Sequence, residues 1–304
     1  MCESCGCSDN TKTRLINLQS GATLAIDSAN DPGHTHYHVH EQVHASSDAR
    51  HEHHHHSHHD HDHGHAHSHS HHHHDEAGNG HTDAHSHSHS DGATVRLETD
   101  VLAKNNRLAE RNRGWFAGRN IFALNLMSAP GAGKTTLLER TITDLKNELA
   151  ISVIEGDQET INDAERIRAT GCRVVQINTG TGCHLDAVML EKGLQQLDPP
   201  VNSVVMIENV GNLVCPALFD LGERSRVVIA SVTEGDDKPI KYPHMFRQSE
   251  VMILNKIDLL PYVPFNVDRC VAYAREVNPQ IRIIQVSALR GDGLGEWYDW
   301  IRHQ

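Results

Sequence analysis

Positive charge and long apolar runs are both scarce in this sequence. Its 304 residues carry 27 Lys and Arg against 40 Asp and Glu, a net charge of −13 with histidine neutral. Without a basic stripe, a nucleic-acid-binding surface is not expected. No stretch approaches the roughly 20 apolar residues that span a bilayer, and the N-terminus has no apolar signal-peptide core. We therefore expect a cytoplasmic protein that binds neither nucleic acid nor membrane.

Cysteine is also sparse, and its distribution argues against a disulfide framework. The chain has seven cysteines, an odd number, and three of them lie within the first seven residues. This pattern favours reduced thiols in a cytoplasm, which leaves the thiols available to bind metal ions.

Large apolar residues are few before residue 93, and this marks a boundary in the chain. Residues 1–92 hold most of the histidines among many Ser, Gly and Asp, so burial cannot offset the entropy of ordering them. We expect this arm to be disordered without metal, whereas 93–304 contains all three Trp and suits one globular core. Within the arm we distinguish a cysteine site at 1–10, a linker at 11–33 and a His-rich metal-binding region at 34–92.

Apolar segments alternate with helical patterns throughout the second part. Strands are expected at 121–127, 151–156, 173–178, 203–209, 226–232, 250–255 and 281–287. Helices are expected at 134–149, 161–170, 184–197, 266–277 and 294–302, after an amphipathic helix at 94–113 with apolar positions at Leu97, Val101, Leu102 and Leu108. This order predicts an α/β fold with a mainly parallel sheet covered by helices on both faces. Ligands bind such sheets at the carboxyl ends of the strands.

A phosphate-binding loop is predicted directly after the first of these strands. The segment SAPGAGKTT at 128–136 combines a helix N-terminus with glycines that let backbone N–H groups approach phosphates. Lys134 can reach the β- and γ-phosphates, which makes it a catalytic candidate, and Thr135 can ligate Mg²⁺. Ser128 stands where the general pattern has Gly, and the alternative is a Gly-rich turn before a helix. The predicted nucleotide contacts are Gly131, Ala132, Gly133, Lys134, Thr135 and Thr136.

Base recognition is predicted at Asn255-Lys256-Ile257-Asp258, which also ends an apolar segment. The Asp258 carboxylate can accept from guanine N1–H and the 2-amino group together, whereas adenine would present a ring lone pair. An unmatched buried acceptor costs about 1–3 kcal/mol, which is enough to select GTP over ATP. Two residues that close the next strand complete the set, so the predicted contacts are Asn255, Lys256, Asp258, Ser287 and Ala288.

Acidic residues end two further strands, at Asp157 and Glu208. One carboxylate can hold a magnesium-bound water or orient the attacking water, and we take Asp157 as the catalytic candidate. Both are predicted magnesium ligands with Thr135, and the Gly211 N–H is placed to sense the γ-phosphate. The common switch pattern is Asp-x-x-Gly, so the Glu at 208 leaves its role open. Solvated acids at strand ends are the alternative.

The N-terminal arm carries two kinds of metal donor. Cys2, Cys5 and Cys7 supply three thiolates, and a backbone nitrogen or the α-amine can complete the set that square-planar Ni²⁺ accepts. An incidental reactive cluster is the alternative. The tract 34–89 holds 25 of the 28 histidines, interleaved with Asp, Ser and Gly unlike an engineered tag, and has capacity for on the order of five to ten ions. Its densest part, assigned to storage, comprises His53, His54, His55, His56, His58, His59, His61, His63, His65, His67, His69, His71, His72, His73 and His74.

A second candidate metal site lies within the globular domain. Cys183 and His184 are expected to begin a helix, which favours the thiolate form, and Cys215 lies four residues after Gly211. By spacing alone, buried cysteines with a capping histidine are an equal alternative.

Together these motifs resemble the HypB family, the nickel-inserting GTPases of [NiFe]-hydrogenase maturation. The resemblance covers the N-terminal Cys-x-x-Cys-x-Cys and residues 94–304, including NNRLAERNR, SAPGAGKTT, IEGDQ, TGCHLDA, IENVGNLVCPA, SVTEGDDKPIKYPHMF and LNKIDLLPY. It implies a dimerising GTPase with GTP or GDP and Mg²⁺, and with partners in a HypA-type nickel/zinc accessory protein and a hydrogenase large-subunit precursor. It also implies a tight nickel site at Cys2, Cys5 and Cys7 and a weaker nickel or zinc site at Cys183, His184 and Cys215.

The predicted function is that of a GTP-hydrolysing metallochaperone that stores nickel and delivers it to the hydrogenase precursor. Two alternatives stay open, a nickel buffer with a regulatory GTPase and a urease-type nickel GTPase. The cysteine-rich start and the LVCPA segment argue against the urease type.

Overall fold

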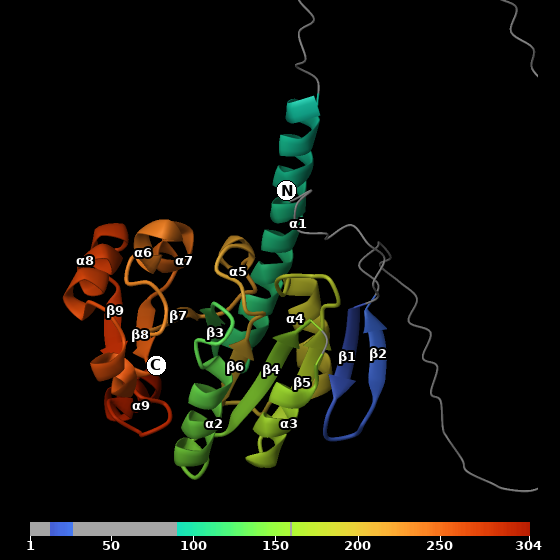
Figure 1. The fold of residues 1–304 in the computed structure, drawn as a ribbon. Helices are drawn as coiled ribbons and strands as arrows, with labels where there is room; N and C mark the ends of the chain where they lie inside the picture. The colour runs from blue at the N-terminus through green and yellow to red at the C-terminus, as the bar shows by residue number, and fades with distance from the viewer. Residues whose placement is uncertain (1–12, 27–89, 159) are drawn as a thin grey trace, which may run out of the picture. The chain divides into compact units, whose positions relative to one another are not determined.

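Nine strands form one sheet in the part of the chain that the structure describes. The computed structural model describes residues 13–26, 90–158 and 160–304 (Figure 1). In chain order the strands are β1 (Thr13–Asn17), β2 (Thr23–Ile26), β3 (Phe122–Ser128), β4 (Ile151–Asp157), β5 (Arg173–Asn178), β6 (Val204–Glu208), β7 (Ser225–Ser231), β8 (Val251–Asn255) and β9 (Arg282–Gln285).

The sheet is mainly parallel, as the sequence predicted. Its order is β2-β1-β5-β4-β6-β3-β7-β8-β9. Strands β3 to β9 pair in parallel, whereas β1 pairs antiparallel with both β2 and β5. Because β6 lies between β4 and β3, the segments that leave the carboxyl ends of these three strands begin side by side at one edge.

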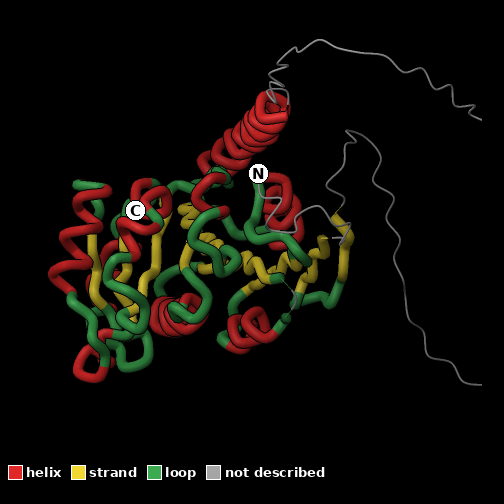
Figure 2. Tube along the Cα trace, turned by 45° about the horizontal axis from the view of Figure 1, so that its top comes forward, coloured by secondary structure: helices red, strands yellow, loops and turns green. Residues whose placement is uncertain are grey.

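Helices cover both faces of this sheet (Figure 2). One apolar cluster joins Leu124 and Leu126 of β3 to α2, α3 and α9, and two others join Ala123 and Met127 to the remaining larger helices. Alternate residues of β3 thus point to opposite faces, as the strand geometry requires. The helices are α1 (Ser90–Gly118), α2 (Lys134–Leu145), α3 (Asn162–Ala169), α4 (Ala187–Leu197), α5 (Cys215–Leu218), α6 (Lys238–Lys241), α7 (Pro243–Arg247), η1 (Ile257–Tyr262), α8 (Val267–Val277) and α9 (Leu294–Arg302).

Residues 13–26, predicted as linker, form the β1–β2 hairpin instead. Leu15 pairs with Ile177 of β5, and the Leu15 and Ile26 side chains are only 1% and 3% exposed. Two strands of five and four residues are too short to give a readable alternation. Their stability comes from the open edge of β5, which the tertiary fold supplies.

Helix α1 was expected from the sequence, but the side chains that it buries were not. Asn105, Ala109, Asn112 and Phe116 are buried, whereas Val101 is 36% exposed. The two asparagines hydrogen-bond backbone groups of neighbouring segments, so these polar contacts hold the helix on the domain together with the buried Phe116.

The hairpin gives a direct test of the fold. Replacing the buried Leu15 by Ala should lower the free energy of unfolding by about 3 kcal/mol, because the change leaves a cavity beside β5. Arg14→Ala is the matched control, since the exposed Arg14 lies on the opposite face of the same strand. Urea unfolding measures both variants. Equal stabilities for the two would show that the hairpin does not pair with β5 in solution.

Candidate functional site

A cavity of about 480 Å³ opens at the carboxyl edge of the sheet. It lies where the β3–α2 loop, the end of β4 and the segment after β6 meet. Most of the predicted phosphate and magnesium residues line it, together with five residues that were not among the predicted contacts. The lining is Pro130, Gly131, Gly133, Lys134, Thr135, Thr136, Asp157, Gln158, Asp163, Arg166, Val210, Gly211 and Lys256.

The phosphate loop is fixed by hydrogen bonds to the Asn255–Asp258 segment. Asn255 Nδ2 donates to the Ala132 carbonyl at 2.9 Å, and Lys256 Nζ donates to the Gly131 carbonyl at 2.7 Å. Gly133 has φ +95°, and a Cβ there would lie 2.5 Å from Asn255 Nδ2. Only glycine therefore fits at position 133, because both the backbone conformation and the close approach exclude a side chain.

The residues predicted to read the base come together at the ends of β8 and β9. Ser287 Oγ donates to Asp258 Oδ1 at 2.6 Å, and the Ala288 N–H donates to Asn255 Oδ1 at 3.1 Å. The Asp258 side chain is only 7% exposed. The carboxylate is thus held in one orientation by Ser287.

Glu208 is a buried carboxylate beneath the phosphate loop. Thr135 Oγ1 donates to its Oε1 at 2.8 Å, and its Oε2 has no hydrogen-bond partner among the described residues. Burial raises the pKa of Glu208 to about 6, although the Lys134 charge and the Thr135 hydrogen bond oppose that rise. Asp157 lies in the cavity wall, where its Oδ2 accepts from the Thr160 N–H and Oγ1, both at 2.8 Å.

A second buried glutamate, Glu155, was missed by the motif analysis. It is 2% exposed and stands opposite Glu208 in the register of β4 and β6. Burial raises its pKa well above the usual range, and the neighbouring Glu208 and Asp157 carboxylates add to the shift. An acid inside the apolar strand ISVIEGD was a visible signal for this site.

Arg166 of α3 was also missed, because nothing local in its helix marks it. Its guanidinium donates to Glu139 Oε2 at 2.5 Å and to Thr136 Oγ1 at 3.3 Å, which places a cation at the cavity wall. Only the packing of α3 against α2 reveals this position.

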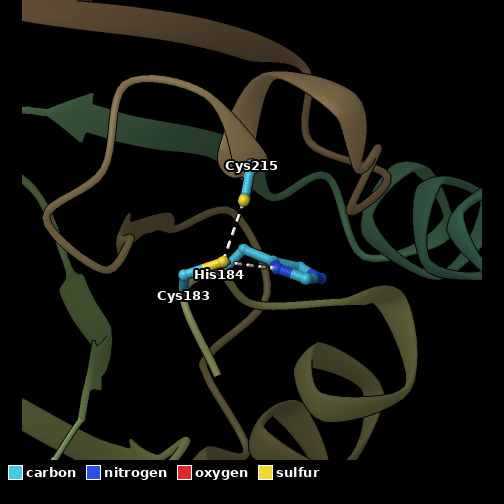
Figure 3. Close-up of side chains that lie close together, drawn as sticks. All are labelled: Cys183, His184 and Cys215. Atoms are coloured by element: carbon cyan, nitrogen blue, oxygen red, sulfur yellow. Dashed lines mark hydrogen bonds between the residues drawn. The ribbon is translucent and has the colours of Figure 1, made fainter. Parts of the chain in front are cut away.

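Cys183, His184 and Cys215 lie close together although they come from two separate segments (Figure 3). Their ligand atoms all lie within 4.8 Å of one another, and Cys183 Sγ donates to Cys215 Sγ at 2.8 Å. The His184 ring stacks on Phe219 at 3.8 Å, and burial lowers the pKa of His184, although nearby Asp186 opposes this. A neutral imidazole and two thiols form a donor set that suits a borderline divalent ion.

Helix α4 begins later than predicted, so Cys183 and His184 do not begin it. The first helical residue is Ala187, because the Asp186 side chain caps the helix by accepting from the Met189 N–H at 2.8 Å. The predicted helix-terminus effect on Cys183 is therefore wrong. Cys215, in contrast, is the first residue of the short helix α5.

Two predicted metal-binding groups lie outside the described residues. These are the N-terminal set Cys2, Cys5 and Cys7 and the histidine tract at 34–89. Within the described ranges, no helix combines the length and apolarity needed to cross a bilayer.

The fold and this cavity define a class of protein. A glycine-rich loop joins a central parallel strand to a helix, and an Asn-Lys-x-Asp segment lies beside it, as in the P-loop GTPases. The family model described as CobW/HypB/UreG, nucleotide-binding domain, matches residues 122–285.

Known relatives and solved structures narrow the class further. The chain is 58% identical over 210 residues to the hydrogenase maturation factor HypB of Escherichia coli K12, covering 69% of this chain and 72% of that one. The crystal structure of HypB from Archaeoglobus fulgidus has a TM-score of 0.62 at 43% identity, covering 66% of this chain and 98% of that one. The crystal structure of HypB from Helicobacter pylori in complex with nickel has a TM-score of 0.62 at 35% identity, covering 66% of this chain and 94% of that one. The chain belongs to the HypB hydrogenase maturation factors within the CobW/HypB/UreG family.

The Asp258 carboxylate provides a test of base selection. Asp258→Asn should abolish the preference for GTP and create binding of xanthosine triphosphate, because xanthine carries an oxygen where guanine has its 2-amino group. We expect GTP affinity to fall by about 10-fold or more, measured by fluorescent-nucleotide displacement. Asp268→Asn, on α8, is the control. Unchanged GTP affinity in Asp258→Asn would refute the assignment.

Proposed function

We propose that this chain hydrolyses GTP and uses the nucleotide state to control nickel delivery to a hydrogenase large-subunit precursor. One observation carries the proposal: the segment that follows β6 serves both sites. Gly211 lines the phosphate cavity, and Glu208 accepts a hydrogen bond from Thr135 of its wall. Cys215, four residues after Gly211, belongs to the thiol–imidazole group, which is Cys183, His184 and Cys215. A change at the γ-phosphate therefore has a short covalent route to a metal ligand.

For hydrolysis, we propose that Lys134 neutralises the β- and γ-phosphates and that Asp157 orients the attacking water. Both side chains line the cavity, and Lys134 Nζ is held 3.1 Å from Ser128 Oγ, close to the loop that would cradle the phosphates. Backbone N–H groups of Gly131 to Thr136 bind phosphate oxygens, and the Gly211 N–H contacts the γ-phosphate.

The donors beside Thr135 fit Mg²⁺. A hydroxyl and carboxylates are ligands that Mg²⁺ prefers, and within the described part of the chain the buried Glu208 Oε2 has no hydrogen-bond partner. Thr135, Asp157 and Glu208 would hold the ion directly or through water. When bound, it offsets the charge of the phosphates.

Nickel is the cargo of this protein in the proposed function, not a resident cofactor. Cys183, His184 and Cys215 would hold it within the domain, where zinc could compete for the same donors. The nickel complex of the Helicobacter pylori relative supports this choice of metal. Cys2, Cys5 and Cys7 would give tighter binding, and the histidine tract would supply capacity.

The β1–β2 hairpin supports transfer of nickel between the N-terminal cysteines and the candidate metal site at Cys183. Arg14 of β1 pairs with Asn178 at the carboxyl end of β5, and Cys183 follows Asn178 by five residues. Cys7 precedes Thr13 by six residues, and an extended chain of that length reaches roughly 20 Å.

We propose that a HypA-type partner and a second copy of this chain complete the delivery complex.

Hydrogenase maturation in a host that lacks its own factor tests the proposal. Lys134→Ala should reduce GTP hydrolysis by about 100-fold or more and abolish hydrogenase activity at limiting nickel. Lys146→Ala, an exposed lysine just after α2, is the control and should restore activity fully. Equal restoration by both variants would remove nucleotide chemistry from the function.

Removal of residues 34–89 separates delivery from storage in the same assay. A delivery protein should still mature hydrogenase when nickel is plentiful. Loss of activity at excess nickel would contradict the storage role of the tract, because excess nickel replaces a store but not a delivery element.

A further inference from the structure

Asn209 connects the nucleotide segment to the metal segment through its side chain. It directly follows Glu208, is 1% exposed, and its Oδ1 accepts from two backbone donors. These are the Val210 N–H at 3.0 Å and the Leu185 N–H at 3.2 Å. Two N–H groups that face the same atom require it to be the amide oxygen, so the orientation of the side chain is fixed by its neighbours.

The two donors belong to the two candidate sites. Val210 precedes Gly211 and itself lines the phosphate cavity. The Leu185 N–H belongs to the peptide unit that begins at the His184 carbonyl, so this hydrogen bond sets the backbone direction immediately after two metal ligands. The Asn209 backbone is held on β3, because its own N–H donates to the Leu126 carbonyl at 3.0 Å. A shift of Val210 would therefore displace Asn209 Oδ1, the oxygen that accepts hydrogen bonds from both Val210 and Leu185.

A second branch of the same network reaches the chain segment that follows α5, the helix that begins at Cys215. Asn209 Nδ2 donates to Asn125 Oδ1, and Asn125 Nδ2 donates to Glu223 Oε1, both at 3.2 Å. Glu223 Oε2 in turn accepts from the Leu221 N–H at 2.8 Å. One buried amide is thus bonded directly to the residue after His184, a ligand drawn in Figure 3, and through this branch to Leu221, six residues after Cys215. Such buried networks tolerate few arrangements, because each lost hydrogen bond leaves a desolvated group.

We infer that Asn209 is a positioning residue that makes metal affinity at Cys183, His184 and Cys215 depend on the bound nucleotide. The inference rests on the proposed function, since it assumes that the γ-phosphate acts on the Val210–Gly211 segment. Asn209 is neither among the residues that line the cavity nor among the three candidate metal ligands. Its role is to convert a movement of Val210 into a movement of the backbone beside His184.

The test uses the full chain with Cys2, Cys5 and Cys7 replaced by Ser. Nickel affinity is measured in nickel-buffered solution, with GDP and with a non-hydrolysable GTP analogue, from the thiolate-to-nickel charge-transfer band. Histidine does not give this band, and among the described residues Cys172 and Cys270 belong to no group of three or more metal donors, so the signal reports Cys183 and Cys215. The ratio of the two Kd values measures the coupling, which is typically between about 5-fold and 150-fold.

Asn209→Ala should bring this ratio to within about 2-fold of one, because the link is lost in both nucleotide states. Asn112→Ala is the matched control. Asn112 is an equally buried amide that bonds the Ala187 and Leu221 carbonyls on the metal side, and both of its acceptors lie away from the nucleotide segment. It should change both Kd values alike and keep the ratio.

Each other outcome overturns the inference in a distinguishable way. A wild-type ratio retained in Asn209→Ala removes the role of Asn209 and leaves the proposed coupling in place. Loss of the ratio in both Asn209→Ala and Asn112→Ala shows a general structural effect. If the two Kd values are already equal in the chain with Asn209 and Asn112 intact, nucleotide and metal are not coupled, and both the proposed coupling and the inference are wrong.

Hydrogen exchange on the unaltered chain covers the case in which Asn209→Ala does not fold. The Leu185 amide should exchange at different rates with GDP and with the GTP analogue. The Ala187 amide, which donates to Asn105 Oδ1 on α1 at 2.9 Å, is the internal control and should exchange equally in both. Equal rates for Leu185 would overturn the inference.

Discussion

The parallel pairing of β6 with both β3 and β4 is the constraint on which the rest of the structure depends. In the register of the sheet, Glu208 stands beside Leu126 on one side and Glu155 on the other. The phosphate loop, the Asp157 turn and the segment after Glu208 must therefore start from neighbouring points. That segment then has only a few residues in which to cross from the phosphate cavity to Cys215, and this brevity places the two sites within reach of each other.

Buried polar groups at this edge follow two opposite patterns. Within the described ranges, Glu155 Oε2 and Glu208 Oε2 have no hydrogen-bond partner, a cost of about 1–3 kcal/mol for each such group that proteins accept mainly at functional sites. Asn105 and Asn209 instead have both ends of their amides bonded to neighbouring segments, and Asn112 Nδ2 donates to two backbone carbonyls. The unmatched carboxylates mark where a cation can bind. The matched amides fix the loops around that place, so that a movement of one loop has a defined effect on the next.

Local patterns in the sequence predicted those parts of the structure that local physics determines. The apolar strands, the glycine loop before Lys134 and the Asn255–Asp258 segment follow from periodicity and spacing, and the family follows from the motifs. The β1–β2 hairpin could not be predicted, because its burial depends on the free edge of β5. The same holds for the buried asparagines of α1, whose partners are backbone groups of distant segments, and for the later start of α4, which one capping aspartate decides. The meeting of Cys183, His184 and Cys215 was proposed from the family resemblance, and it arises from contacts across 31 residues of sequence that spacing does not encode.

Reciprocity gives the most direct test of the link between nucleotide and metal, since a coupling free energy acts equally on both ligands. The measurement is the affinity for GDP and for a non-hydrolysable GTP analogue, with and without nickel, in the full chain with Cys2, Cys5 and Cys7 replaced by Ser. If the two sites are linked through the segment after β6, nickel will change the ratio of the two nucleotide affinities, and Cys183→Ser will remove that change. An affinity ratio that is the same with and without nickel would contradict the account.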